Sequence, residues 1–356
     1  MQIHIHGIIR DASAAHEKCI REGEGAPAAT LASKRKNNPD KTRSLSDTPM
    51  NAILPLIENV ERVIVGKRPV VELAVIAMLC RGHVLLEDVP GTGKTMLARA
   101  LARSVAVDMK RLQCTPDLLP SDITGVPIYN QKTADFEFRP GPVFTNLLLA
   151  DEINRATPRA QSALLECMDE FRVSVDGATY DLPPLFMVLA TQNPIDMAGT
   201  HPLPEAQLDR FFVRLGVGYP TVAEEVRILA AQVLSHPIDD LRPVTTEAAI
   251  MEMREQVKKI YISPDVAEYV ARLTAATRQH PDLRLGAGPR GTLALARGAQ
   301  GLAFLRERAF VTPDLVKSMV GPVLEHRLII RPQSAAIGRT VRTILTEIVS
   351  QVAPPV

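Results

Sequence analysis

The 356-residue sequence lacks an excess of charge of one sign, clustered cysteines and a long apolar run. Its 41 Lys and Arg residues stand against 40 Asp and Glu residues, so no global field draws the chain onto nucleic acid or anionic lipid. No run of about 18 apolar residues and no signal-peptide apolar region is present, so neither membrane insertion nor export is expected and the cytoplasm is the expected location. The four cysteines lie far apart without a CxxC pair, which argues against a zinc site or a disulfide framework and fits a reducing compartment: Cys19, Cys80, Cys114 and Cys167.

Residues 1–49 differ in composition from the rest of the chain. They are rich in Ala, Gly, Pro, Ser and charged residues without sustained apolar periodicity, which predicts a disordered tail. Three histidines, His4, His6 and His16, lie in this segment, but without an ordered scaffold they do not predict a metal site. An amphipathic helix is expected to begin near Met50, in "MNAILPLIENVERVIVG", so residues 1–49 also fit an over-extended gene start.

Residues 50–218 alternate between helical and strand patterns, and the 46% hydrophobic content is enough to bury a core. Apolar strands are predicted in "HVLLED", "VFTNLLLAD" and "LFMVLAT", with helices in "VELAVIAMLC", "TMLARALARSVA" and "PRAQSALLECMDEF". This order predicts an α/β fold with a parallel sheet covered by helices on both faces. Two hairpin inserts are expected, at "TGVPIYNQKTADFEFRP" and at "FRVSVDGATYDLP", and the turn of the second is Asp176-Gly177. After Tyr219-Pro220 the pattern becomes helical, which predicts a second, all-helical domain over residues 219–356.

The segment "DVPGTGKT", residues 88–95, lies between a predicted strand and a predicted helix, as a phosphate-binding loop requires. Gly91 and Gly93 would let backbone N–H groups approach phosphates, Lys94 would reach the β- and γ-phosphates, and the Thr95 hydroxyl would ligate Mg²⁺. The usual pattern begins with Gly, where this chain has Asp88. The alternative is a Gly-rich turn with an incidental Lys. The residues expected to bind the nucleotide are Pro90, Gly91, Thr92, Gly93, Lys94, Thr95 and Met96.

Polar side chains end two further predicted strands. In "NLLLADE", Asp151 is placed to hold Mg²⁺ through water and Glu152 to polarise an attacking water, although acidic pairs after strands are also common helix N-terminal charges. In "FMVLATQNP", Asn193 is expected to orient the water or to sense the γ-phosphate; a turn-forming Asn before Pro is the alternative. The sequence therefore predicts an ATP site with Mg²⁺ at the carboxyl ends of three strands.

Four segments together carry a family resemblance: "GHVLLEDVPGTGKT", "FRPGPVFTNLLLADEINRATPRAQSALLECMDE", "LATQNPIDMAGTHPLPEAQLDRF" and "RLGAGPRGTLALARGAQGLAF". Residues 51–354 resemble the MoxR family of AAA+ ATPases. The resemblance implies a P-loop NTPase domain with a C-terminal helical lid, assembled into a ring, usually a hexamer. It also implies that Arg210 is an arginine finger acting in a neighbouring subunit, and that Arg290 is a second sensor that contacts the γ-phosphate. For Arg210 the alternative is a surface salt bridge with Asp209 or a neighbour.

The resemblance also bears on the rim of the site. It places Val65 and Gly66 against the adenine, but Lys67 stands where the family often has Gln, and Gly288 where it commonly has Ser. A trans role at a subunit interface suits Arg155 and Arg159, which fit an exposed helix start equally well.

The composition of the hairpin inserts indicates which kind of partner the protein binds. In related nucleic-acid helicases such hairpins carry basic residues, whereas "YNQKTADFEF" has one Lys and "VSVDGATYD" has no basic residue. A protein client therefore fits better, and the resemblance implies chaperone-like activation or maturation of a partner, commonly alongside a protein with a von Willebrand factor A domain. The alternatives are a nucleic-acid-associated AAA+ motor and a nucleotide-gated scaffold with little turnover.

Overall fold

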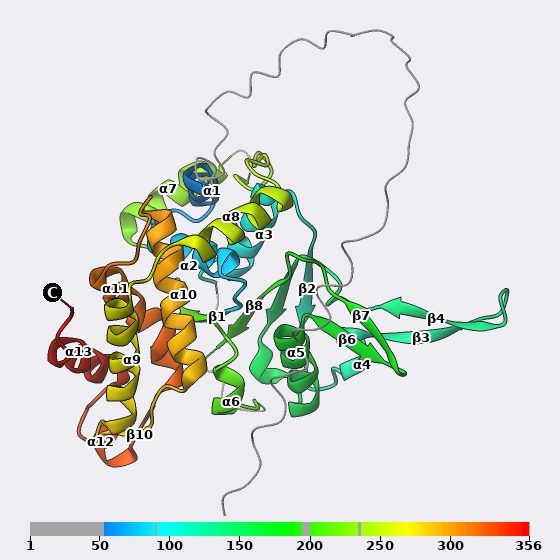
Figure 1. Cartoon of the computed structure of the whole chain (residues 1–356). Coiled ribbons are helices and arrows are strands. Elements are labelled where there is room, and N and C mark those ends of the chain that lie inside the picture. Colours follow the sequence, from blue (N-terminus) through cyan, green and yellow to red (C-terminus); the bar gives the residue numbers. More distant parts are fainter. Residues whose placement is uncertain (1–52, 90, 194–199, 234–235, 356) are drawn as a thin grey trace, which may run out of the picture. The chain divides into compact units, whose positions relative to one another are not determined.

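The structure, a computed structural model, describes residues 53–89, 91–193, 200–233 and 236–355 (Figure 1). The predicted tail at residues 1–49 and loop residue Pro90 lie outside these ranges. Among the described helices, none combines the length and the hydropathy needed to cross a bilayer.

A five-stranded parallel sheet forms the centre of the first part of the chain, with strand order β2-β5-β8-β1-β9. Three of these strands were predicted: β1 (Val84–Glu87), β5 (Leu147–Asp151) and β8 (Met187–Gln192). The edge strands β2 (Met109–Gln113) and β9 (Val213–Leu215) were not. Strand β2 was not predicted because its sequence, MKRLQ, is largely polar and has one buried residue, Leu112.

Helices cover both faces of this sheet, as predicted. Along β1, Val84 and Leu86 belong to one apolar cluster and Leu85 to another, because successive strand residues point to opposite faces. The cluster containing Val84 packs against α1 (Ile53–Glu61), α2 (Arg68–Leu79) and α3 (Lys94–Val105), and the cluster containing Leu85 against α5 (Pro158–Glu170). The short helices α4 (Pro120–Thr124) and α6 (Glu205–Leu208) flank α5 and the segment before β9.

Both hairpin inserts form as predicted. Strands β3 (Gly125–Asn130) and β4 (Asp135–Pro140) pair antiparallel and project from the domain (Figure 1), and β6 (Arg172–Val175) pairs with β7 (Ala178–Asp181). Asp176 and Gly177 both have positive φ, 50° and 78°, as a two-residue hairpin turn of type I′ requires. Phe138 of the first hairpin stacks on Tyr180 of the second with 4.1 Å between ring centroids, so the two inserts contact each other.

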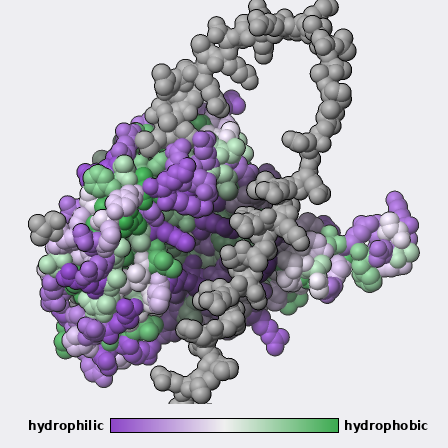
Figure 2. Space-filling model, in the orientation of Figure 1, coloured by the Kyte–Doolittle hydropathy of each residue, from purple (hydrophilic) through white to green (hydrophobic). Residues whose placement is uncertain are grey.

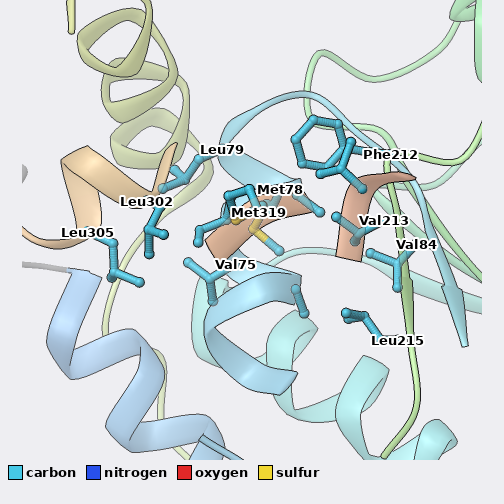
Figure 3. Close-up of a cluster of buried hydrophobic side chains, with 14 of the residues drawn as sticks. Val75, Met78, Leu79, Val84, Phe212, Val213, Leu215, Leu302, Leu305 and Met319 are labelled. Carbon is cyan, nitrogen blue, oxygen red and sulfur yellow. The ribbon is translucent and has the colours of Figure 1, made fainter. Parts of the chain in front are cut away.

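The C-terminal part consists mainly of helices: α7 (Val222–Gln232), α8 (Glu247–Lys259), α9 (Pro264–Gln279), α10 (Pro289–Leu305), α11 (Pro313–Leu324), α12 (Pro332–Ala336) and α13 (Val341–Gln351). It is not all-helical, because β10 (Leu283–Leu285) and β11 (Ile329–Ile330) pair antiparallel. Figure 3 shows how these helices share a core with the sheet: Leu302 and Leu305 of α10 and Met319 of α11 pack beside Val75 of α2 and Val213 of β9.

Candidate nucleotide site

A cavity of about 360 Å³ lies at the carboxyl ends of β1, β5 and β8, within the range typical of small-molecule sites. Most of the side chains predicted from the three strand ends line it, together with one that was not singled out, Thr191. The lining residues are Gly91, Gly93, Lys94, Thr95, Asp151, Glu152, Thr191 and Asn193. The structure therefore brings the loop, the acidic pair and Asn193 to one place.

The loop reaches its shape through two glycines and a lysine. Gly91 and Gly93 have φ values of 83° and 89°, in the left-handed region where only glycine is unstrained, and α3 begins at the next residue. Lys94 Nζ donates hydrogen bonds to the carbonyl oxygens of Asp88 (2.6 Å) and Val89 (2.9 Å). Partial burial lowers the Lys94 pKa, and the carboxylates of Asp88, Asp151 and Glu152 oppose that shift. Lys94 is thus a cation held at the loop, within electrostatic range of the acidic pair.

Asp88, where the usual loop pattern has Gly, ties the loop to the strand edge. One carboxylate oxygen accepts a hydrogen bond from the Val89 N–H at 2.8 Å, and the other accepts one from the Gly218 N–H, just after β9. The departure from the family pattern therefore gives the loop entry a side-chain anchor that Gly cannot provide.

Thr191 joins the two acidic residues. Its hydroxyl donates to Asp151 Oδ1 at 2.6 Å and accepts from the Glu152 N–H at 2.8 Å, and the residue is 1% exposed. Glu152 has φ 58°, a left-handed conformation that a non-glycine residue seldom adopts. Thr191 holds Glu152 in this turn by engaging its backbone. No local pattern marks Thr191, because its role depends on the pairing of β5 with β8.

Two side chains of the unpredicted strand β2 also reach the acidic pair. Arg111 contacts Asp151 Oδ2 at 2.6 Å, and Gln113 Nε2 donates to Glu152 Oε2 at 3.4 Å. Arg111 also donates to Gln113 Oε1 at 2.9 Å, since residues i and i+2 share one face of a strand. Predicting MKRLQ as a strand beside β5 would have placed Arg111 and Gln113 next to the acidic pair.

The remaining predicted contacts lie at the rim. Arg155 pairs with Glu152 Oε2 of its own chain at 3.1 Å, whereas Arg159 is exposed on the first turn of α5. Thr92 donates to the Val89 carbonyl, which braces the loop, and Met96 packs against the apolar cluster below it.

The segment of Val65 and Gly66, expected beside the adenine, contacts the start of α7. Gly66 has φ 76°, and a Cβ placed there would lie 1.8 Å from Glu224 Oε1. Lys67 Nζ donates to the Tyr219 carbonyl at 2.8 Å. Ile64, immediately before the segment, is the nearest neighbour of Gly93, so the segment lies beside the loop. Neither Val65 nor Gly66 is among the cavity-lining residues.

The two arginines implied by the family resemblance lie elsewhere. Arg210 Nε and Arg290 Nη2 both contact Asp169 Oδ2, at 3.1 and 3.4 Å. Asp169 follows Met168, whose carbonyl is bonded to His83 Nε2 at 3.0 Å, and His83 directly precedes β1. The cavity lies at the other end of β1, five residues away, or roughly 16 Å along an extended strand. In this chain Arg210 and Arg290 therefore face away from the chain's own cavity.

A third arginine, which the sequence did not single out, holds this region together. Arg327, 6% exposed, bonds to Asp209 Oδ1 at 2.8 Å and to the carbonyl oxygen of Phe211 at 2.6 Å. Burial lowers its pKa to about 10, so it remains charged at neutral pH. Arg327 follows α11, and it fixes the segment that carries Arg210 to the C-terminal helices.

Comparisons with known proteins agree with this geometry. Residues 83–213 match the family model described as "ATPase family associated with various cellular activities (AAA)", and residues 275–348 match an AAA lid domain. The chain is 49% identical to the Bacillus subtilis protein YeaC, over 84% of this chain and 94% of that protein. It is 39% identical to chaperone MoxR1 of Mycobacterium tuberculosis, over 84% of this chain and 81% of that protein.

Two further relatives support the same assignment. Protein MoxR of Paracoccus denitrificans is 32% identical over 76% of this chain and 86% of that protein. The crystal structure of a candidate ATPase from Cytophaga hutchinsonii superposes with a TM-score of 0.81 at 36% identity, covering 86% of this chain and 96% of that one. The matches to an AAA ATPase model and an AAA lid model, together with relatives named MoxR that are 32% and 39% identical, show that the chain belongs to the MoxR family of AAA+ ATPases, which hydrolyse ATP.

Proposed function

We propose that this ATPase couples Mg²⁺-dependent ATP hydrolysis to the chaperone-like remodelling or activation of a protein client. The observation that carries the catalytic part is the convergence of Lys94, Asp151, Glu152 and Asn193 on one cavity from three strand ends. The relatives named MoxR and chaperone MoxR1 support the chaperone-like part.

The cavity residues divide the chemistry among them. Glu152 accepts a proton from the attacking water, Lys94 exchanges the loop carbonyls for phosphate oxygens, and Asn193 orients the water or senses the γ-phosphate. The Thr95 hydroxyl and the Asp151 carboxylate line the same cavity and are the hard oxygen donors that Mg²⁺ prefers, so these two residues would hold the ion. When bound, Mg²⁺ supplies charge neutralisation for the phosphates.

The placement of Arg210 and Arg290 supports hydrolysis between subunits. Both side chains bind Asp169 at the amino end of β1, so neither can reach the cavity of its own chain. A neighbouring copy with this face against the cavity would bring in the missing positive charge, which is how arginine fingers stabilise phosphoryl transfer. The proposed assembly is a closed ring, a hexamer by family resemblance, because such a contact is head-to-tail.

An unpartnered apolar face on α7 also supports self-assembly. Val222, Val226, Leu229 and Val233 recur at helical spacing and are 78%, 59%, 68% and 76% exposed. Through Glu224, the same helix packs on Gly66 beside the phosphate loop. Apolar stripes of this size on a surface commonly mark contacts with another protein, and this one adjoins the proposed shared site.

The projecting β3–β4 hairpin is the proposed client contact. Tyr129 and Phe136 face each other near its tip, with 5.4 Å between ring centroids, and are 52% and 67% exposed. The projecting part of the surface carries hydrophobic as well as hydrophilic residues (Figure 2). Exposed aromatic side chains suit a protein surface, and Asp135 and Glu137 oppose the single Lys132 near the tip, which disfavours a nucleic-acid backbone. We further propose that the client acts together with a protein that has a von Willebrand factor A domain.

The decisive experiment measures the ATPase rate per subunit against protein concentration, with Mg²⁺ and with EDTA. We expect a rate that climbs steeply with concentration, disappears in EDTA and is lost in Glu152→Gln. The Glu152→Gln chain then serves as an ATP-bound trap for the client. Activity that persists in EDTA would contradict the role given to Mg²⁺. A flat rate from a protein that sediments as a monomer would contradict the shared site.

A further inference from the structure

A second cavity, distinct from the nucleotide site, lies where α2, α8 and α10 meet. Its volume is about 550 Å³. Leu79, Pro184, Met251 and Val257 give it an apolar wall, and the other lining residues are Cys80, Arg81, Arg254, Glu255, Lys258, Arg297 and Gln300. Arg81 comes just before β1 and Pro184 just before β8, so this cavity lies at the end of the sheet opposite the nucleotide site.

The cavity contains three arginines without acidic partners. Among the described residues, no carboxylate lies within ion-pair distance of Arg81, Arg254 or Arg297, whereas the one acidic lining residue, Glu255, pairs with Lys258 at 2.6 Å. The lining carries four basic side chains and one acidic one, a net charge of about +3, and Glu247 opposes the lowering of the Arg254 pKa without lying within ion-pair distance. Charge of one sign in a cavity is costly unless a ligand or solvent compensates it.

Arg254 is the buried member of this group. It is 4% exposed; its Nε donates to the Met78 carbonyl and its Nη1 to the Pro184 carbonyl, both at 2.9 Å, and its Nη2 has no hydrogen-bond partner among the residues that the structure describes. Burial first, and the charge of Arg81 second, lower its pKa to about 10, so it stays charged at neutral pH. Two backbone bonds fix its position, and Nη2 is enclosed by protein atoms, so Arg254 contributes its charge behind the cavity wall.

Arg81 occupies a costly backbone position. It has φ 56° immediately after the Cys80 cap of α2, where the Gly82 N–H bonds back to the Ala77 carbonyl, and glycine is the residue usually found at such a position. Its guanidinium lies 3.8 Å from the centre of the Phe171 ring, so the charge is held at the cavity rim by the aromatic face.

We propose that this cavity binds a small phosphomonoester, with the exposed Arg81 and Arg297 at the phosphoryl group, the buried charge of Arg254 behind them, and the apolar wall against the organic part. A doubly charged phosphoryl group has three terminal oxygens, which suits several guanidinium donors better than a single carboxylate does. The ligand would join the end of α2 and the start of β8 to α8 and α10, and so brace the sheet against the C-terminal helices.

The test is calorimetric titration of the full chain carrying Lys94→Ala, which weakens phosphate binding at the nucleotide loop. The probes are inorganic phosphate, phenyl phosphate and phenol. We expect one phenyl phosphate per chain, weaker binding of inorganic phosphate, and no binding of phenol. Arg81→Ser and Arg297→Ser, both at exposed positions, should each weaken phenyl phosphate at least tenfold. Arg272→Ser, at an exposed arginine on α9 that does not line the cavity, is the matched control and should leave binding unchanged.

The proposal would be overturned by no binding of either phosphate, by affinity unchanged in both arginine variants, by an equal loss in Arg272→Ser, or by phenol binding as well as phenyl phosphate. A phosphotyrosine peptide serves as a fourth probe and should bind more weakly than phenyl phosphate. Tighter binding of the peptide would refute a small-molecule ligand and assign the phosphoryl group to a protein.

Discussion

Subunit mixing tests the placement of Arg210 most directly. An Arg210→Ala chain keeps an intact cavity but presents a defective face to its neighbour. A Glu152→Gln chain has a defective cavity but an intact arginine face, because Glu152 lines the cavity and Arg210 lies at the far end of β1. Each variant alone should be nearly inactive: loss of an arginine finger costs about 10³- to 10⁵-fold, and loss of the general base removes proton transfer.

The expected yield of the mixture follows from counting interfaces. In a ring assembled from equal amounts of the two chains, a working site forms where the intact cavity of an Arg210→Ala chain meets the intact arginine face of a Glu152→Gln chain. About one half times one half of the interfaces meet this condition, so up to about a quarter of the wild-type rate should return. The assay is steady-state phosphate release after co-refolding or prolonged subunit exchange.

The matched control mixes Glu152→Gln with Lys94→Ala. Both chains then have a defective cavity and an intact arginine face, so no interface can work and no rate should return. Recovery in the first mixture alone supports the trans arrangement. If the first mixture is no more active than the sum of its parts although both chains assemble together, Arg210 does not act on a neighbour's nucleotide and the reasoning from Asp169 and His83 fails.

Three further outcomes are expected. His83 accepts the Val188 N–H at Nδ1, and burial lowers its pKa from 6.5 to about 4. Between these pH values the unfolded chain binds a proton that the folded chain does not, so the contribution of His83 to the free energy of unfolding falls by up to about 3 kcal/mol from pH 6.5 to pH 4. His83→Gln should therefore reduce the pH dependence of the free energy of unfolding, measured with urea, over that range. Gly288→Ser should raise stability by about 0.5 kcal/mol, because Gly288 caps α10 in an extended conformation with open space for a side chain; a lower melting temperature would contradict this. Val226→Ser with Leu229→Ser should shift the assembled state toward monomer in sedimentation without lowering the unfolding free energy of the monomer, whereas unchanged assembly would exclude α7 from the interface.

Local sequence was enough to predict the phosphate loop and the acidic pair. Gly91 and Gly93 permit the left-handed backbone of the loop between a strand and a helix, and Asp151 ends a short apolar run typical of a buried strand. The sheet with helices on both faces followed from the same alternation.

Tertiary pairing decided what local sequence could not. Arg111, Gln113 and Thr191 meet the acidic pair only because β2 and β8 flank β5, and the polar sequence of β2 conceals that it is a strand. The β10–β11 pair is equally hidden, since strands of three and two residues leave no periodic signal. The site roles assigned from the sequence remain predictions to be tested by the variants above.

The buried Arg327 has a mechanical consequence under the proposed ring arrangement. It clamps the Asp209–Phe211 segment to the end of α11, while Arg290 at the start of α10 shares Asp169 with Arg210. In the proposed ring, a tilt of the C-terminal helices in one subunit would therefore move both arginines relative to the next subunit's nucleotide. Force that a client exerts on one subunit would then pass to the neighbouring site in a single direction around the ring.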